Sequence, residues 1–230
     1  MIIYKRMLAV ILAAVLALGL IACGATDSQK EPSMEELAAL LVQGNLDEIY
    51  LGKVSQEYLD LIGSTEEDAR ETYEEGLSYE AEYFADYFDI DVLSDPLKEQ
   101  IMDLYREIYS HVRYTVGNAS KLDENTYVVK VDVEPINVME LAMDAEDTAT
   151  ADFFAKYADV DVESMTDEEY EAYDAEWAQA VIATVQAQVP VLAYKPGVSL
   201  AVQVVRGDDG AWQISDSDMG DLDEQMIYYP

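Results

Sequence analysis

Two segments in which apolar residues recur at every second position constrain the fold of this chain more than any other feature. The first segment contains alternating runs at 112–116 and 127–133, separated by a turn near 123–125. The second contains runs at 200–204 and 212–214, separated by an Arg-Gly-Asp-Asp-Gly turn. Successive side chains of a β-strand point to opposite faces, so each segment predicts a β-hairpin with one buried face.

Apolar residues with the period of an α-helix occupy most of the rest of the chain. A hydroxyl residue with Glu three positions later is a capping signal for a helix start, and it occurs at Ser33–Glu36, Ser64–Glu67 and Thr166–Glu169. Asp95, followed by proline, predicts a further start, and Gly44 predicts the end of the first helix. We also expect one helix over 137–158 and a short one over 221–228. Helices and hairpins together predict an α+β fold.

One ten-residue segment has an internal counterpart. Residues 83–92 and residues 153–162 are identical at six of ten positions, and each segment precedes a capped helix and then a hairpin. An old duplication of a helix–helix–hairpin unit would explain this pattern. Similar helix ends in a chain of biased composition would explain it equally well.

The N-terminal residues have the organisation of a signal peptide. Lys5 and Arg6 precede an uncharged apolar run from Met7 to Leu20, which is shorter than the ~20 residues needed to span a bilayer. The run ends in Leu20-Ile21-Ala22-Cys23, which resembles the lipobox of bacterial lipoproteins. By that resemblance, cleavage before Cys23 is followed by attachment of a diacylglyceryl group to its sulfur. The alternative is an uncleaved membrane helix with an incidental cysteine.

Charge and cysteine content narrow the class of protein. The chain from Cys23 onward carries 11 Lys and Arg against 48 Asp and Glu, a net charge of −37. Such a charge disfavours nucleic acid and anionic lipid as partners and favours cations or a basic partner, although a solvated surface is the simpler interpretation. Cys23 is the only cysteine, so packing rather than disulfides must stabilise the fold.

Motifs for catalysis or for metal binding are not recognisable. His111 has no nucleophile motif to act with, and we expect it to mark a junction between helix and strand. Alternating acids at 89–91 and 159–163 suggest calcium, but the second segment lacks the Gly at position six and the Glu at position twelve of an EF-hand loop. We therefore expect no catalytic residue, no metal site and no cofactor.

Three aromatic residues are placed on predicted strands. Tyr114, Tyr127 and Trp212 occupy positions that alternate with polar residues. Their simplest role is in the core. A second hypothesis is a ligand pocket on the sheet, between the strands and the helices.

The chain resembles small lipoproteins of Gram-positive bacteria whose domain of unknown function is described as cystatin-like or nuclear-transport-factor-2-like. The lipobox carries the resemblance together with Ala38–Asp47, a helical segment closed by Gly-Asn-Leu-Asp, and Val131–Val138, a strand ending in proline. The resemblance implies N-terminal helices and two hairpins that form a curved antiparallel sheet packed by helices. It implies no catalytic residues.

These observations lead to one functional hypothesis and one alternative. We expect a signal peptide at 1–22, a lipidated tether at 23–32 and a single α+β domain at 33–230. The protein would be anchored at the extracytoplasmic face of the cell membrane and would act as a non-catalytic module that binds a protein or a cell-envelope ligand. The alternative is a cell-surface hydrolase that acts on cell-wall or glycan material through carboxylates not identifiable among the 48 acids.

Overall fold

The computed structural model describes residues 32–208 and 210–230, which group into two compact units. The first unit comprises residues 32–73, 114–133 and 198–223, and the second comprises 74–113, 134–197 and 224–230. The fold is α+β, as predicted: the described residues form eight α-helices and an open, four-stranded antiparallel sheet packed by helices. None of these helices combines the length and the apolar character needed to cross a bilayer.

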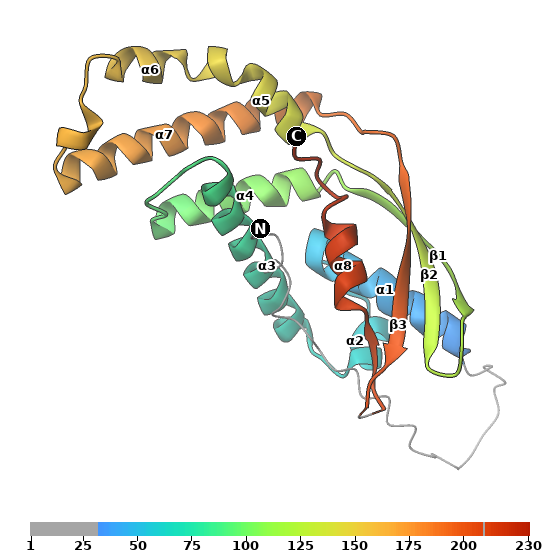
Figure 1. The fold of residues 1–230 in the computed structure, drawn as a ribbon. Helices are drawn as coiled ribbons and strands as arrows, with labels where there is room; N and C mark the ends of the chain where they lie inside the picture. Colours follow the sequence, from blue (N-terminus) through green and yellow to red (C-terminus); the bar gives the residue numbers. More distant parts are fainter. Residues whose placement is uncertain (1–31, 209) are drawn as a thin grey trace. The chain divides into compact units, whose positions relative to one another are not determined.

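The sheet is the centre of the first unit, and its strand order is β1-β2-β3-β4 (Figure 1). The strands are β1 (Arg113–Lys121), β2 (Thr126–Glu134), β3 (Val198–Arg206) and β4 (Trp212–Ile214). Val129 of β2 lies opposite Val202 of β3 in the antiparallel register. Tyr127, Val129, Val131 and Val133 are all buried, which confirms the predicted inward face of this strand.

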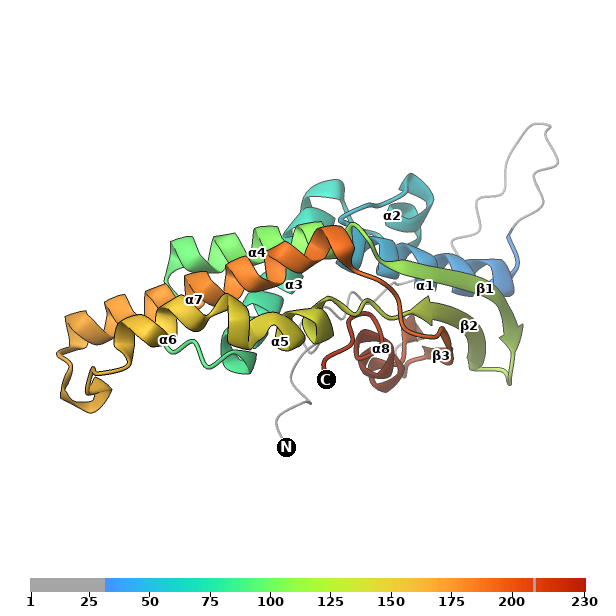
Figure 2. The ribbon, with the colours of Figure 1, turned by 90° about the horizontal axis from the view of Figure 1, so that it is seen from above.

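Helices pack on this sheet. They are α1 (Met34–Leu51) and α8 (Asp216–Asp223); the unit also contains α2 (Gln56–Ile62), which packs on α1, and the first turns of α3 (Glu66–Tyr87). Both α1 and α8 contact β3, and Figure 2 shows α8 beside β3. The capping box predicted at Ser33–Glu36 is present at the start of α1. The next one is displaced by one residue, because Thr65 and Asp68 make the reciprocal contacts at the start of α3 in place of Ser64 and Glu67.

Gly44 does not end the first helix, so that prediction was wrong. Helix α1 continues to Leu51 and ends at Gly52, whose φ of 59° is readily adopted only by glycine. The role of Gly44 is steric: a Cβ atom there would lie 2.1 Å from Cδ2 of Tyr58 on α2. The missing side chain therefore lets α1 and α2 approach each other closely.

The second unit is helical. It contains the remainder of α3 together with α4 (Asp95–Tyr109), α5 (Val138–Ala149), α6 (Ala151–Tyr157) and α7 (Asp167–Gln188). Helix α7 contacts α4, α5 and α6, and both ribbon views show it running beside them (Figures 1 and 2). The core of the second unit includes the fully buried side chains of Phe84, Ile101, Tyr105, Ile108 and Val185.

Three predicted helix ends in this part of the chain need correction. Ser94 rather than Asp95 is the N-cap of α4, and it makes no side-chain capping bond. The helix predicted over 137–158 is broken at Thr150, whose hydroxyl donates to the carbonyl of Glu146 and which separates α5 from α6. The helix predicted over 221–228 begins and ends earlier in the chain, because α8 spans Asp216–Asp223.

The C-terminal tail is held by backbone bonds within the second unit. Ile136 forms isolated β-bridges with Tyr194 and with Ile227. The Tyr105 and Tyr229 hydroxyls lie 2.6 Å apart. These contacts replace the helix predicted for the tail.

The internal counterpart segments occupy equivalent places in the element order. Residues 83–92 end α3 and lead to α4, and residues 153–162 include the end of α6 and lead towards α7. The α3–α4 pair precedes β1 and β2, and the α6–α7 pair precedes β3 and β4. The order agrees with a duplicated helix–helix–hairpin unit. Duplication and the single domain at 33–230 both stay predictions.

Candidate functional site

The residues singled out in the sequence lie in different places. Cys23, the predicted lipidation site, lies outside the described residues. His111 lies in the turn between α4 and β1, as predicted, and its carbonyl accepts a hydrogen bond from the Tyr194 hydroxyl at 2.8 Å. Its side chain is exposed.

The first of the two acidic segments considered for calcium, at 89–91, has other contacts. The backbone N–H groups of Asp91 and Val92 donate to the carboxylate of Asp174 on α7, at 3.1 and 2.8 Å. The carboxylate of Asp91 accepts a hydrogen bond from the Tyr170 hydroxyl. Within residues 32–208 and 210–230, no group of three His, Cys, Asp or Glu residues is arranged to hold a metal ion.

The aromatic residues of the strands contribute to the core of the first unit. Tyr127 is buried and meets the half-buried Trp212 in an edge-to-face contact with ring centres 5.3 Å apart. The half-buried Tyr114 donates its hydroxyl to Asp47 on α1. The cavity beside Trp212, between α1, α2 and β3–β4, measures about 10 Å³. That volume holds at most about one water molecule, so this region offers no room for a larger ligand.

A buried carboxylate lies in the first unit, between α1 and α2. Glu48 is only 3% exposed, and the Tyr58 hydroxyl donates to its Oε2 at 2.6 Å. Burial raises the pKa of Glu48, and the hydrogen bond from Tyr58 opposes that effect in part. Burial and the neighbouring carboxylate both raise the pKa of Tyr58. The pair is sealed within the unit rather than open to a substrate.

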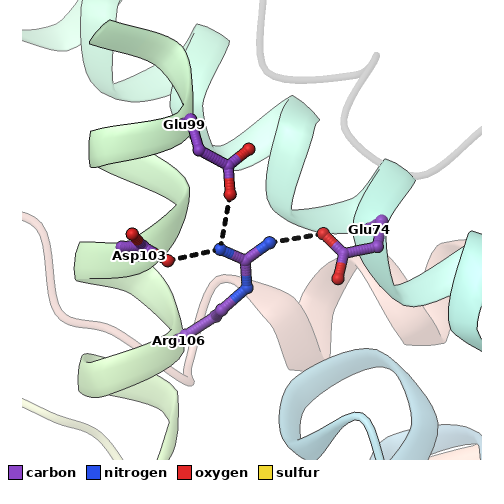
Figure 3. A network of polar contacts seen from close by, with 4 residues as sticks. All are labelled: Glu74, Glu99, Asp103 and Arg106. Atoms are coloured by element: carbon purple, nitrogen blue, oxygen red, sulfur yellow. Dashed lines mark hydrogen bonds and ion pairs between the residues drawn. The ribbon is translucent and has the colours of Figure 1, made fainter. Parts of the chain in front are cut away.

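A cluster of charged groups links two helices of the second unit (Figure 3). The guanidinium of Arg106 on α4 bonds to Glu74 on α3, to Glu99 at 3.0 Å and to Asp103 at 2.5 Å. Burial acts to lower the pKa of Arg106, but the three carboxylates outweigh it and raise that pKa. The arginine is therefore engaged on its own chain, and we interpret the cluster as a link between α3 and α4.

The most distinctive exposed feature is an aromatic surface on α6 and α7. We define the α6–α7 aromatic surface as the side chains of Phe153, Phe154, Tyr157, Tyr173 and Trp177. Phe153 is the hub, with ring centres 5.0–5.5 Å from those of the other four. The ring of Phe154 lies 5.7 Å from that of Trp177. Phe154 is 54% exposed, so its ring is open to a partner.

Hydrogen bonds fix the α7 side of this surface. The indole Nε1 of Trp177 donates to the carbonyl of Phe88 at 2.7 Å. Asp174, one turn earlier on the same helix, accepts the two backbone N–H groups of the α3–α4 connection described above. The tryptophan is therefore held in a defined orientation, as a preorganised binding surface requires.

An open hollow lies beside the aromatic rings. It measures about 420 Å³ and is lined by Asp152, Phe153, Lys156, Ala175, Glu176 and Gln179. The small side chain of Ala175 leaves space that a larger residue would fill. Lys156 bonds both oxygens of Glu176, at 2.6 and 2.5 Å, and this interaction lowers the pKa of Glu176. The hollow therefore combines one aromatic residue, the buried Phe153, with the charged side chains of Asp152, Lys156 and Glu176.

Sequence reasoning found only part of this surface. The helical period of the sequence places Tyr173 and Trp177, which are four residues apart, on one side of a helix. It did not reveal the exposure of Phe154, because Phe154 follows the unpredicted break at Thr150. An uninterrupted helix over 137–158 would have turned this residue to a different direction.

Comparisons with known proteins bear on the fold. No protein-family model matches the chain, and no curated protein matches it. A crystal structure of a candidate lipoprotein (ycdA) from Bacillus subtilis subsp. subtilis strain 168 is similar, with a TM-score of 0.57 and 14% sequence identity. The likeness covers 89% of this chain and 62% of the Bacillus protein, so the chain spans less than two thirds of its neighbour's length. The fold is therefore like that of a candidate lipoprotein.

Proposed function

We propose that the protein is a lipoprotein anchored by a diacylglyceryl group on Cys23 and that it acts as a binding module at the outer face of the cell membrane. The lipobox ending Leu20-Ile21-Ala22-Cys23 supports the anchor. The fold likeness to a candidate lipoprotein is consistent with it. Two acyl chains, at about 0.8 kcal/mol per buried CH₂, give stable attachment.

The observation that carries the binding function is the α6–α7 aromatic surface with its adjoining hollow. Phe154 is exposed, and Tyr157, Tyr173 and Trp177 are half-buried around the buried Phe153, so part of an aromatic cluster faces solvent, as in many binding sites. Phe154 and Trp177 come from different helices, so the surface is a property of the folded chain. The hollow of about 420 Å³ is largely open to solvent, so a ligand would lie against it rather than be enclosed by it.

Two carboxylates favour binding over hydrolysis. A general acid needs a raised pKa and access to substrate. Glu48 has the raised pKa, but it is buried against Tyr58 and does not line the hollow. Glu176 lines the hollow, but the hydrogen bond from Lys156 lowers its pKa. We therefore propose a module without catalytic activity.

We also propose that the domain is related to the cystatin-like or nuclear-transport-factor-2-like lipoproteins. The support is a four-stranded antiparallel sheet packed by helices, preceded by helical segments. The resemblance of Ala38–Asp47 and Val131–Val138 to that group adds to it.

A fluorescence titration tests the binding function. The chain has two tryptophans, so Trp212→Phe leaves Trp177 as the reporter on the α6–α7 aromatic surface, and Trp177→Phe leaves Trp212 as the control. The purified full chain would be titrated with soluble cell-wall fragments, with basic peptides and with acidic peptides. We expect at least one of these to change the emission of Trp177 and not that of Trp212. A flat response of Trp177 to every ligand would refute the proposed function.

A further inference from the structure

We propose that the α6–α7 aromatic surface binds a cationic amphipathic peptide segment, with apolar side chains on the rings and lysine or arginine at the acidic rim. This inference rests on the proposed binding function and names the class of partner for it. Two independent features of the second unit lead to it, the exposed rings and the local charge.

The apolar half of the site is available to a partner. Phe154 is more than half exposed, and Trp177 beside it is half-buried with its Nε1 already bonded to Phe88. A partner therefore meets the faces and edges of the rings rather than an unsatisfied donor. The hollow next to Phe153 can accept one large apolar side chain of that partner.

The charge of the helices that carry the rings favours a cationic partner, and Asp152 and Glu176 line the hollow itself. Residues 138–188, from α5 to the end of α7, contain 14 acidic residues and a single basic one, Lys156. The acidic residues are Glu140, Asp144, Glu146, Asp147, Asp152, Asp159, Asp161, Glu163, Asp167, Glu168, Glu169, Glu171, Asp174 and Glu176. Lys156 is itself engaged by Glu176. The field over this part of the chain is strongly negative, so it attracts positive partners and accelerates their association.

The charge also favours a cationic peptide over other classes of partner. A second copy of the chain would bring the same excess of acid to the contact, and like charges facing each other oppose association. An anionic lipid headgroup or a nucleic acid would be repelled for the same reason. A neutral glycan could stack on Phe154 and Trp177 but would gain nothing from the carboxylates. Lysine and arginine gain from the carboxylates and, over the face of a tryptophan, from a cation–π contact.

The experiment uses the full, lipidated chain in a nonionic detergent, with Trp212→Phe so that Trp177 reports binding. The probe is a short synthetic peptide of lysine and leucine that forms an amphipathic helix. One control peptide carries glutamate in place of lysine, and another carries serine in place of leucine. The same titration without protein corrects for binding of peptide to micelles.

Two matched variants locate the site. Phe154→Ser removes the exposed ring of the α6–α7 aromatic surface, and Leu122→Ser makes the same kind of change at an apolar residue that is 65% exposed in the first unit. Because both side chains are largely in water, neither change should prevent folding, and circular dichroism would verify this. We expect Phe154→Ser to weaken binding of the lysine–leucine peptide about tenfold or more and Leu122→Ser to change it less than about twofold.

Charge dependence gives the second readout. We expect ~1 M salt, at which the Debye length falls to about 3 Å, to abolish most of the binding, and we expect neither control peptide to bind. Equal binding of the glutamate peptide, equal binding by Phe154→Ser, or no binding of the lysine–leucine peptide would each overturn the inference. A response of Trp177 to cell-wall fragments alone, or self-association that depends on Phe154, would overturn it too. Binding of cell-wall fragments alone would leave the proposed function standing.

Discussion

Replacing Gly44 by alanine should destabilise the protein although alanine is the better helix former. In most helix interiors this change gains about 1 kcal/mol. Gly44 is an exception because the added Cβ would lie 2.1 Å from Cδ2, 2.2 Å from Cγ and 2.8 Å from Cβ of Tyr58. Carbon atoms pack at about 3.5 Å or more, so α1 and α2 must separate locally by roughly 1.4 Å.

The cost of that separation can be estimated from what Tyr58 does. It is 2% exposed, so it has little room to move, and overpacking of this kind costs about 1–3 kcal/mol. Displacing its hydroxyl from Glu48 leaves a buried carboxylate without that donor, which costs about 1–3 kcal/mol more. After the gain in helix propensity, Gly44→Ala should lower the free energy of unfolding by about 3 kcal/mol. For a chain of this size, that lowers Tm by about 6–12 °C.

Gly76 supplies the matched control. It lies inside α3, and a Cβ atom there would meet nothing within 4 Å. Gly76→Ala should therefore raise the free energy of unfolding by about 0.5–1 kcal/mol. Both variants would be measured by urea unfolding and by thermal melts followed by circular dichroism. The reasoning is refuted if Gly44→Ala is as stable as Gly76→Ala, or more stable than the unchanged protein.

Three further predictions concern polar groups. Because burial raises the pKa of Glu48 above its usual 4.5, ionised Glu48 weakens the folded state at neutral pH, and that penalty fades as pH falls through the raised pKa. Glu48→Gln should therefore be more stable than the unchanged protein at pH 8, with an advantage that shrinks as the pH falls towards 4.5 in urea titrations. An advantage that grows on acidification would contradict this. Arg106→Leu leaves three carboxylates together and should lower the free energy of unfolding by about 1–2 kcal/mol at pH 7 and by less at pH 4, with Arg106→Lys as the milder control. Asp174→Asn weakens the charge-assisted hydrogen bonds from two backbone N–H groups and should lower the free energy of unfolding by about 2 kcal/mol. Hydrogen exchange at the backbone N–H groups of Asp91 and Val92 should become faster, and unchanged exchange there would contradict this prediction.

The sheet could be predicted because its signal is local. Alternation along 127–133 and 200–204 specifies which side chains face inward, and Val129, Val131, Val202 and Val204 are indeed buried. The capping boxes at Ser33 and Thr166 are equally local, since each consists of contacts between residues three apart, and both are present. The spacing of apolar residues and the chemistry of the capping residues were sufficient to predict these strands and helix starts.

The errors arose where distant contacts override local signals. Gly44 looks like a helix end, but it is required by the ring of Tyr58, which lies on another helix. The break at Thr150 has no proline or glycine to announce it, and it determines where Phe154 points. Helical spacing therefore places Tyr173 and Trp177 on one side of a helix, but it does not predict that α6 brings Phe154 beside Trp177. That arrangement depends on the packing of α6 against α7.

The anchor on Cys23 is tested most directly by the mass of the N-terminal peptide of the protein isolated from membranes of its host. The account predicts a mature chain that begins at Cys23 and carries the added mass of a diacylglyceryl group, and it predicts that Cys23→Ala abolishes both the cleavage and the added mass. Retention of residues 1–22, or an unmodified Cys23 on protein that still fractionates with membranes, would contradict the proposed lipid anchor.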